Sequence, residues 1–337
     1  MSKIIIAILM FLFLILIHEF GHFIIAKLSG IKVNEFSVGM GPKLLSKQKG
    51  ETQYSLRLIP IGGYCAMEGE DEESNDPRSY DNAKPSKRFL TILAGPLMNL
   101  ILAVIIFFII ALNSGSPTNE IGRFAENSPA KEAGMQVGDR IVEVGLKEVN
   151  DFTDISKNLN DYYESHDSKE EIPIKVIRDN KPIDFNLIAE DKDGSKFLGV
   201  ESKLKPRGVF AAIKSGFVET GRNIAMIFTV LGKLFTGEIA VSALSGPIGV
   251  VNEIGNQAAN GLMSLLYFLS YISVNLAVFN LLPIPALDGS KLLTSLYEMV
   301  TKKKVNKKLE EKVTIGGFIL LLGLILIISI KDIITLF

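Results

Sequence analysis

The chain is poor in several residue types, and each scarcity excludes certain classes of protein or structural feature. Cys65 is the single cysteine among 337 residues, which excludes an intramolecular disulfide framework and a cysteine-rich zinc module. Lys and Arg number 36 against 37 Asp and Glu, a net charge of −1, so a nucleic-acid binder driven by bulk basicity is not expected. Tryptophan is absent, so no tryptophan belt marks a membrane interface.

Long hydrophobic runs are what the sequence does contain. Hydrophobic residues make up 47% of the chain, with a mean hydropathy of +0.30. The excess is concentrated in four stretches without a charged side chain: Ile4–Ile17, Phe89–Asn119, Met263–Leu287 and Val313–Ile330. A helix needs about 20 residues to cross a hydrocarbon core of ~30 Å, and the first stretch reaches that length when it is extended through His22. The sequence therefore predicts a polytopic α-helical membrane protein with four transmembrane helices.

The first run resembles a signal peptide in its basic start and apolar core. No small-x-small cleavage site follows it, and the run continues into His18-Glu19-Phe20-Gly21-His22. We therefore expect this segment to be retained as a membrane span.

The polar segments divide the chain into four regions: residues 1–112, 113–206, 207–262 and 263–337. Between the first two spans, Val33–Val38 and Tyr54–Ile59 are punctuated by glycine and proline and are typical of strands. Cys65 and the residues from Glu68 to Lys87 are expected in exposed loops. Residues 208–260 are predicted to be an amphipathic linker at the membrane surface, too often interrupted by charge to span.

The second region, Ser114–Pro206, has the length of one small α+β domain. Its expected strands and short helices are Ile141–Val144, Ile172–Ile177 and Ile183–Ile188 with Lys131–Met135 and Phe152–Asn160.

Lysine and arginine in the connecting loops predict the orientation. Residues 28–88 hold nine of them and residues 285–312 hold seven lysines. The positive-inside tendency places both loops in the cytoplasm, so both termini and Ser114–Pro206 are expected outside. One additional crossing within residues 208–260 would break this parity.

Two of the three histidines lie in one short motif, His18-Glu19-Phe20-Gly21-His22. On a helix, residues four apart share one face about 6 Å apart along the axis, so both imidazoles can reach one Zn²⁺. Glu19 between them is placed to accept a proton from the attacking water. Ionisable groups inside a membrane span are costly and point to function. The alternative is a pair of pore-facing or interhelical polar residues.

A catalytic zinc site keeps one open position beside three protein ligands. Asp288, at the end of the third hydrophobic stretch, is the candidate third ligand in an apolar context. The first and third spans run parallel, and His18 and Asp288 both lie toward their cytoplasmic ends. Pro283 and Pro285 forbid regular helix just before Asp288, so the backbone is expected to unwind there. The alternative is a helix-end residue at the interface. Ligand type alone does not separate zinc from another divalent metal.

These motifs resemble the site-2 protease family of intramembrane zinc metalloproteases, in its bacterial regulator-of-sigma-E protease branch. The resemblance covers almost the whole chain and rests on residues 18–22, 36–42, 57–64, 94–99 and 280–289. It implies His18, His22 and Asp288 as zinc ligands and Glu19 as general base. It also implies that Asn275 and Asn280 hold the substrate backbone or steady the oxyanion, and that the Val33–Tyr64 region is a membrane-associated β-hairpin.

The chain departs from the family pattern at two points. Ser290 stands where the family usually has a second glycine, and there is room for one external domain where some members carry two. Within that domain, Ser128–Ile141 is similar to the core of bacterial PDZ domains, which bind peptide C-termini by strand addition. Peptide binding and a passive steric or size-filtering role both remain open for it.

We therefore expect a zinc metalloendopeptidase of the bacterial plasma membrane that cleaves single-span membrane proteins, such as anti-sigma factors or signal-peptide remnants. No nucleic-acid partner is expected. Two alternatives are a transporter that uses His18, Glu19 and Asp288 as a proton or metal relay, and a membrane-anchored scaffold that acts through the external domain.

Overall fold

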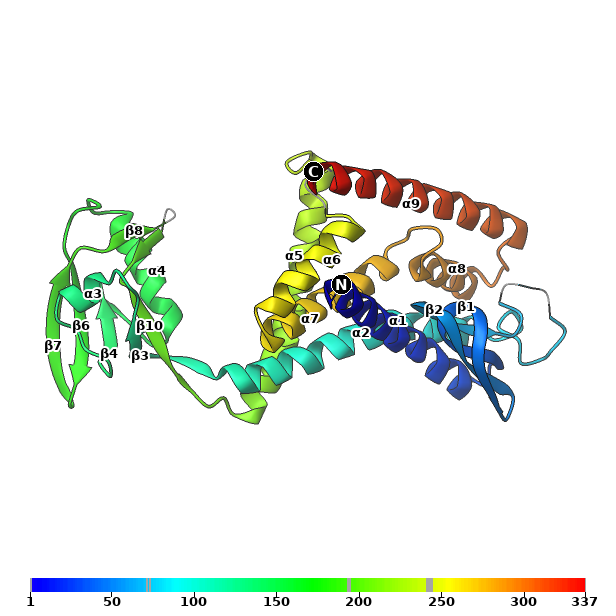
Figure 1. Cartoon of the computed structure of the whole chain (residues 1–337), viewed down its shortest axis with the longest axis horizontal. Coiled ribbons are helices and arrows are strands. Elements are labelled where there is room, and N and C mark those ends of the chain that lie inside the picture. The colour runs from blue at the N-terminus through cyan, green and yellow to red at the C-terminus, as the bar shows by residue number, and fades with distance from the viewer. Residues whose placement is uncertain (1, 71, 73, 193–194, 241–244, 337) are drawn as a thin grey trace. The chain divides into compact units, whose positions relative to one another are not determined.

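The computed structural model describes residues 2–70, 72, 74–192, 195–240 and 245–336. It divides into two compact units: residues 1–110 with 213–337, and residues 111–212. Figure 1 labels most of their helices and strands.

The first unit is built from long apolar helices and a two-stranded sheet. Its elements are α1 (Ser2–Ser29), β1 (Val33–Lys49), β2 (Thr52–Met67), α2 (Pro85–Ser114), α5 (Val209–Thr236), α6 (Pro247–Ala259), α7 (Leu262–Leu281), α8 (Asp288–Thr301) and α9 (Lys307–Leu336). Four of these helices are long and apolar enough to cross a membrane, over Lys3–Ser29, Pro85–Ser114, Leu262–Leu281 and Lys307–Asp332. The prediction of four spans is confirmed among the described residues.

Residues 208–260, predicted to be an amphipathic linker at the membrane surface, contain two helices in their described part, and the surface location stays a prediction. They form α5, a helix of 28 residues, and the shorter α6. α5 packs through Ile227 against Ala103 and Phe107 of α2 and against α7. Within the described residues it is not among the candidate spans.

The sheet of the first unit lies beside the C-terminal half of α1 (Figure 1). Its strands are longer than predicted. Residues 33–38 of β1 pair antiparallel with residues 63–67 of β2, and residues 35–38 also pair on their other side with residues 53–56. Cys65, predicted in an exposed loop, is instead a buried residue of β2. That prediction was wrong because Tyr64–Met67 alternates between half-buried and buried positions, as a strand does.

Cys65 and Glu35 have pKa values that their surroundings shift. Burial raises the pKa of the Cys65 thiol, which keeps it protonated and unreactive. Burial also opposes ionisation of Glu35, but hydrogen bonds from Ser55 and Arg57 prevail and hold the pKa of that carboxyl at about 2.

The stretch between the sheet and α2 is also less exposed than predicted. Ser79 and Tyr80 are buried, and α2 begins at Pro85 rather than near Phe89. Proline is favoured at a helix start because its missing amide hydrogen has no partner there in any case.

The second unit is a small α+β domain. Its main sheet is antiparallel, in the order β10-β3-β4-β6-β7 with β5 beside β4. Its elements are β3 (Ser116–Phe124), α3 (Pro129–Glu132), β4 (Arg140–Val144), β5 (Lys147–Glu148), α4 (Phe152–Tyr163), β6 (Ile172–Arg178), β7 (Lys181–Leu187), β8 (Glu190–Lys192), β9 (Ser195–Phe197) and β10 (Val200–Lys205). The core is formed by alternate strand residues such as Ile172, Ile174 and Val176. A PDZ-like role stays a prediction.

Candidate metal centre

The two histidines of the motif lie on one face of α1. His18 and His22 are both buried, and their Nε2 atoms are 3.2 Å apart. This is the arrangement expected for residues one helical turn apart.

Asp288 reaches the same point from a different helix. α7 ends at Leu281, the proline-containing segment that follows is not helical, and Asp288 is the first residue of α8. Its Oδ2 atom lies 3.0 Å from His18 Nε2 and 3.4 Å from His22 Nε2. Within the part of the chain that the structure describes, these three residues form the one cluster of His, Cys, Asp or Glu able to hold a metal.

The segment before Asp288 is tightly constrained. A Cβ atom on Gly289 would lie 1.9 Å from the Leu282 carbonyl oxygen, so no other residue fits without a backbone shift. Ser290, where the family usually has glycine, donates its hydroxyl to the Leu287 carbonyl at 2.8 Å. The N-terminal end of α8 also favours the negative charge of Asp288.

The protonation of His22 leaves a donor atom facing Asp288. His22 Nδ1 lies 2.8 Å from the Thr91 carbonyl oxygen; a carbonyl only accepts, so the proton is on Nδ1 and Nε2 of the neutral ring has a free lone pair. Asp288 Oδ2 is buried beside it and has no assigned hydrogen-bond donor among the described residues. Two donor atoms placed in this way can bind one cation between them.

The geometry fits zinc. Tetrahedral zinc with bonds of 2.0–2.1 Å has ligand atoms about 3.3 Å apart, and the three distances here are 3.0, 3.2 and 3.4 Å. Two imidazoles and one carboxylate are also a ligand set that catalytic zinc uses.

Asn99 was missed as a site residue in the sequence. It is fully buried on α2, and its side-chain amide nitrogen lies 3.3 Å from His18 Nδ1, while its Oδ1 atom has no partner among the described residues. A half-turn of the amide would place Oδ1 where it accepts the His18 Nδ1 proton. Such a hydrogen bond orients the ring and leaves His18 Nε2 free for the metal. The only sequence signal was the position of Asn99 in the motif of residues 94–99.

Gly95 lets α2 approach the histidines. A Cβ atom there would lie 2.3 Å from His22 Nε2 and 2.9 Å from His18 Cε1. Gly21 on α1 approaches Ala94 of α2 with equal closeness. The two glycines allow the helices to pack so that Thr91 and Asn99 reach the two rings.

Glu19 faces the sheet. Its Oε2 atom accepts a hydrogen bond of 3.1 Å from the backbone amide of Cys65 on β2. That amide points to α1 rather than to β1, so the outer edge of residues 63–67 lies next to the Glu19 carboxylate.

The two predicted asparagines are on α7. Asn275 donates to the carbonyl of Tyr271 in its own helix at 2.8 Å. Asn280 is half-buried in the last turn, and its side chain has no hydrogen bond with any described residue. Neither belongs to the donor cluster, and their predicted role in substrate binding stays a prediction.

Comparison with known proteins identifies the family of the chain. The sequence model of peptidase family M50 matches residues 6–324. Three similar proteins each carry the name “Putative zinc metalloprotease”. One from Clostridium perfringens is 40% identical over 335 residues, 98% of each chain. One from Clostridium acetobutylicum is 38% identical over 336 residues, 98% of this chain and 97% of the relative. One from Fusobacterium nucleatum is 37% identical over 339 residues, 98% of each chain.

Proposed function

The chain belongs to peptidase family M50, the family of site-2 zinc metalloproteases, and we propose that it hydrolyses peptide bonds within or next to transmembrane segments of membrane-protein substrates. The observation that carries the proposal is the meeting of His18, His22 and Asp288 at 3.0–3.4 Å on helices of a multi-pass membrane protein.

In the proposed mechanism, His18, His22 and Asp288 hold the zinc ion. When bound, zinc supplies Lewis-acid chemistry that polarises the scissile carbonyl and lowers the pKa of water. Glu19 takes a proton from the attacking water and delivers it to the leaving amine. Thr91 and Asn99 hold the two imidazole rings in the orientation that this requires.

The substrate is proposed to bind as an extended strand. A transmembrane helix has its backbone groups paired, so it must unwind before its carbonyl is attacked. Residues 63–67 form an edge of β2 that offers backbone groups for strand addition. The hydrogen bond from the Cys65 amide to Glu19 supports this edge as the binding site, because it brings the edge next to the proposed general base. Asn275 and Asn280 are proposed to contact the substrate backbone or the developing oxyanion.

We propose that the protein lies in the bacterial plasma membrane with the metal centre toward the cytoplasm and residues 113–206 outside. The lysine and arginine content of residues 28–88 and 285–312 supports this orientation. The outer domain would then bind a peptide C-terminus or restrict the size of substrates. Anti-sigma factors and signal-peptide remnants are the proposed substrate classes.

The test is a cleavage assay with purified full-length protein and a panel of single-span substrates, combined with metal analysis. Glu19→Gln keeps the shape of the side chain but removes its basicity, so we expect zinc content to be unchanged and cleavage to fall at least about 100-fold, the lower range for general-base catalysis. Full cleavage by Glu19→Gln would refute its role. Metal transport into sealed vesicles without cleavage by the wild type would refute the protease and indicate a transporter.

A further inference from the structure

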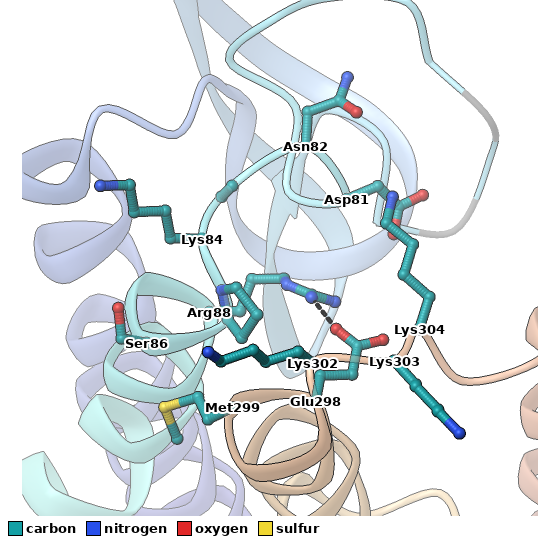
Figure 2. A pocket seen from close by; sticks show the side chains of 12 residues that line it. Asp81, Asn82, Lys84, Ser86, Arg88, Glu298, Met299, Lys302, Lys303 and Lys304 are labelled. Atoms are coloured by element: carbon teal, nitrogen blue, oxygen red, sulfur yellow. Dashed lines mark hydrogen bonds and ion pairs between the residues drawn. The ribbon is translucent and has the colours of Figure 1, made fainter.

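A polar cavity lies outside the metal centre. It has a volume of about 560 Å³ and opens between the first turn of α2 and the end of α8 (Figure 2). None of the metal-centre residues lines it. Its charged lining consists of Lys84, Arg88, Lys302, Lys303 and Lys304 with Asp81 and Glu298.

The acidic groups of this cavity are already neutralised. Glu298 pairs with Arg88, and Asp81 pairs with Lys307. None of the four lining lysines has an ion-pair partner among the described residues. Arg88 Nε is buried and has no hydrogen-bond partner within the same residues. The cavity therefore carries an excess of positive charge and an unused donor.

The N-terminal end of α2 adds to the positive electrostatic potential of the cavity. α2 has 30 residues and no acidic residue in its first turn, so its own sequence does not compensate the positive end of the helix dipole. In Figure 2, Lys302 extends toward this turn, near Ser86, whereas Lys303 extends away from it. The arrangement suits a phosphate group between α2 and α8.

Apolar helices begin beside the cavity. The candidate spans α2 and α9 start there, at Pro85 and Lys307, and Lys307 pairs with Asp81 of the cavity lining. The cavity thus brings cationic groups together with the first turns of two apolar spans, which a soluble phosphate would not need.

We propose that this cavity binds the headgroup of an anionic phospholipid whose acyl chains lie along the apolar spans α2 and α9 that begin beside it. Basic pockets between helices at the membrane surface recognise anionic headgroups in this way. The proposal is independent of the proteolytic function.

The test is native mass spectrometry of the full-length protein in detergent, titrated with phosphatidylglycerol or with phosphatidylcholine of the same acyl chains. We expect one phosphatidylglycerol to bind at concentrations at which phosphatidylcholine does not. Lys302→Ala and Lys84→Ala should each weaken binding about fivefold, the effect of roughly 1 kcal/mol per lysine near an anionic surface.

Lys308→Ala is the matched control, because it removes an equal charge from an exposed lysine near the cavity that does not line it. It should change the affinity less than twofold. An equal loss in Lys302→Ala and Lys308→Ala would overturn the proposal in favour of diffuse surface charge. Equal binding of both lipids would also overturn it, as would equally tight binding of glycerol 1-phosphate, which lacks acyl chains.

Discussion

Replacing Gly95 by alanine should weaken the metal centre without unfolding the protein. The added Cβ atom would lie 2.3 Å from His22 Nε2, more than 1 Å inside an ordinary contact of about 3.5 Å. Zinc–ligand distances hold to about ±0.2 Å, so a movement of His22 that relieves the clash takes its Nε2 atom out of bonding range. Overpacking of this kind costs roughly 1–3 kcal/mol, which corresponds to a zinc affinity about 5- to 150-fold lower.

The assay is competition for zinc between the purified protein and a chelator of known affinity, read as zinc bound per chain. Gly323→Ala on α9 is the matched control, because nothing lies within 4 Å of its added Cβ atom. It should leave zinc affinity unchanged and raise helix stability slightly. Gly95→Ala with the zinc affinity of the wild type would refute the packing argument and the assignment of His22 as a ligand.

Three further outcomes follow from the same contacts. Asp288→Asn removes the anionic ligand, so bound zinc should be lost to chelators at least about tenfold more readily; unchanged retention would exclude Asp288 as a ligand. Asn99→Ala should lower zinc affinity about 10- to 100-fold and Asn99→Asp should restore it, since either oxygen accepts the His18 Nδ1 proton; an Asn99→Ala protein with normal affinity would contradict that role. The pKa of Glu35 is about 2, below its ordinary 4.5, so its ionised form stabilises the fold above pH 4.5, by up to about 3 kcal/mol, and this contribution falls as the pH drops toward 2. The difference in unfolding free energy between wild type and Glu35→Gln in detergent should therefore shrink between pH 6 and pH 3, and a constant difference would contradict the pKa.

The membrane spans and the HExxH helix could be predicted from the sequence because both signals are local. The length of an uncharged run indicates whether it can span the membrane. The four-residue spacing of His18 and His22 places both side chains on one face of a helix. Asp288 required one step more, the matching of depth in parallel spans. Pro283 and Pro285 predicted the break in the helix before Asp288, but the separate helix that begins at Asp288 was not predicted.

The contacts around the metal ligands could not be predicted in the same way. Which amide meets which imidazole depends on how closely α1 and α2 pack, and that is decided by Gly21 and Gly95 together. No spacing in the sequence reports that Asn99 meets His18. The burial of Cys65 against α1 could not be predicted for a similar reason. It depends on the pairing of β1 with two separate parts of β2, which the sequence does not reveal.

Asp288 belongs to α8, not to the span that precedes it, so a metal ion held by the three residues would link α1 to α8. The free energy of metal binding would then also help to hold these two helices together. By thermodynamic linkage, a thousandfold excess of free ion over its dissociation constant would protect the closed arrangement by about 4 kcal/mol. Stripping the ion should thus lower the melting temperature of the membrane unit, while residues 111–212, which hold none of the donors, keep theirs.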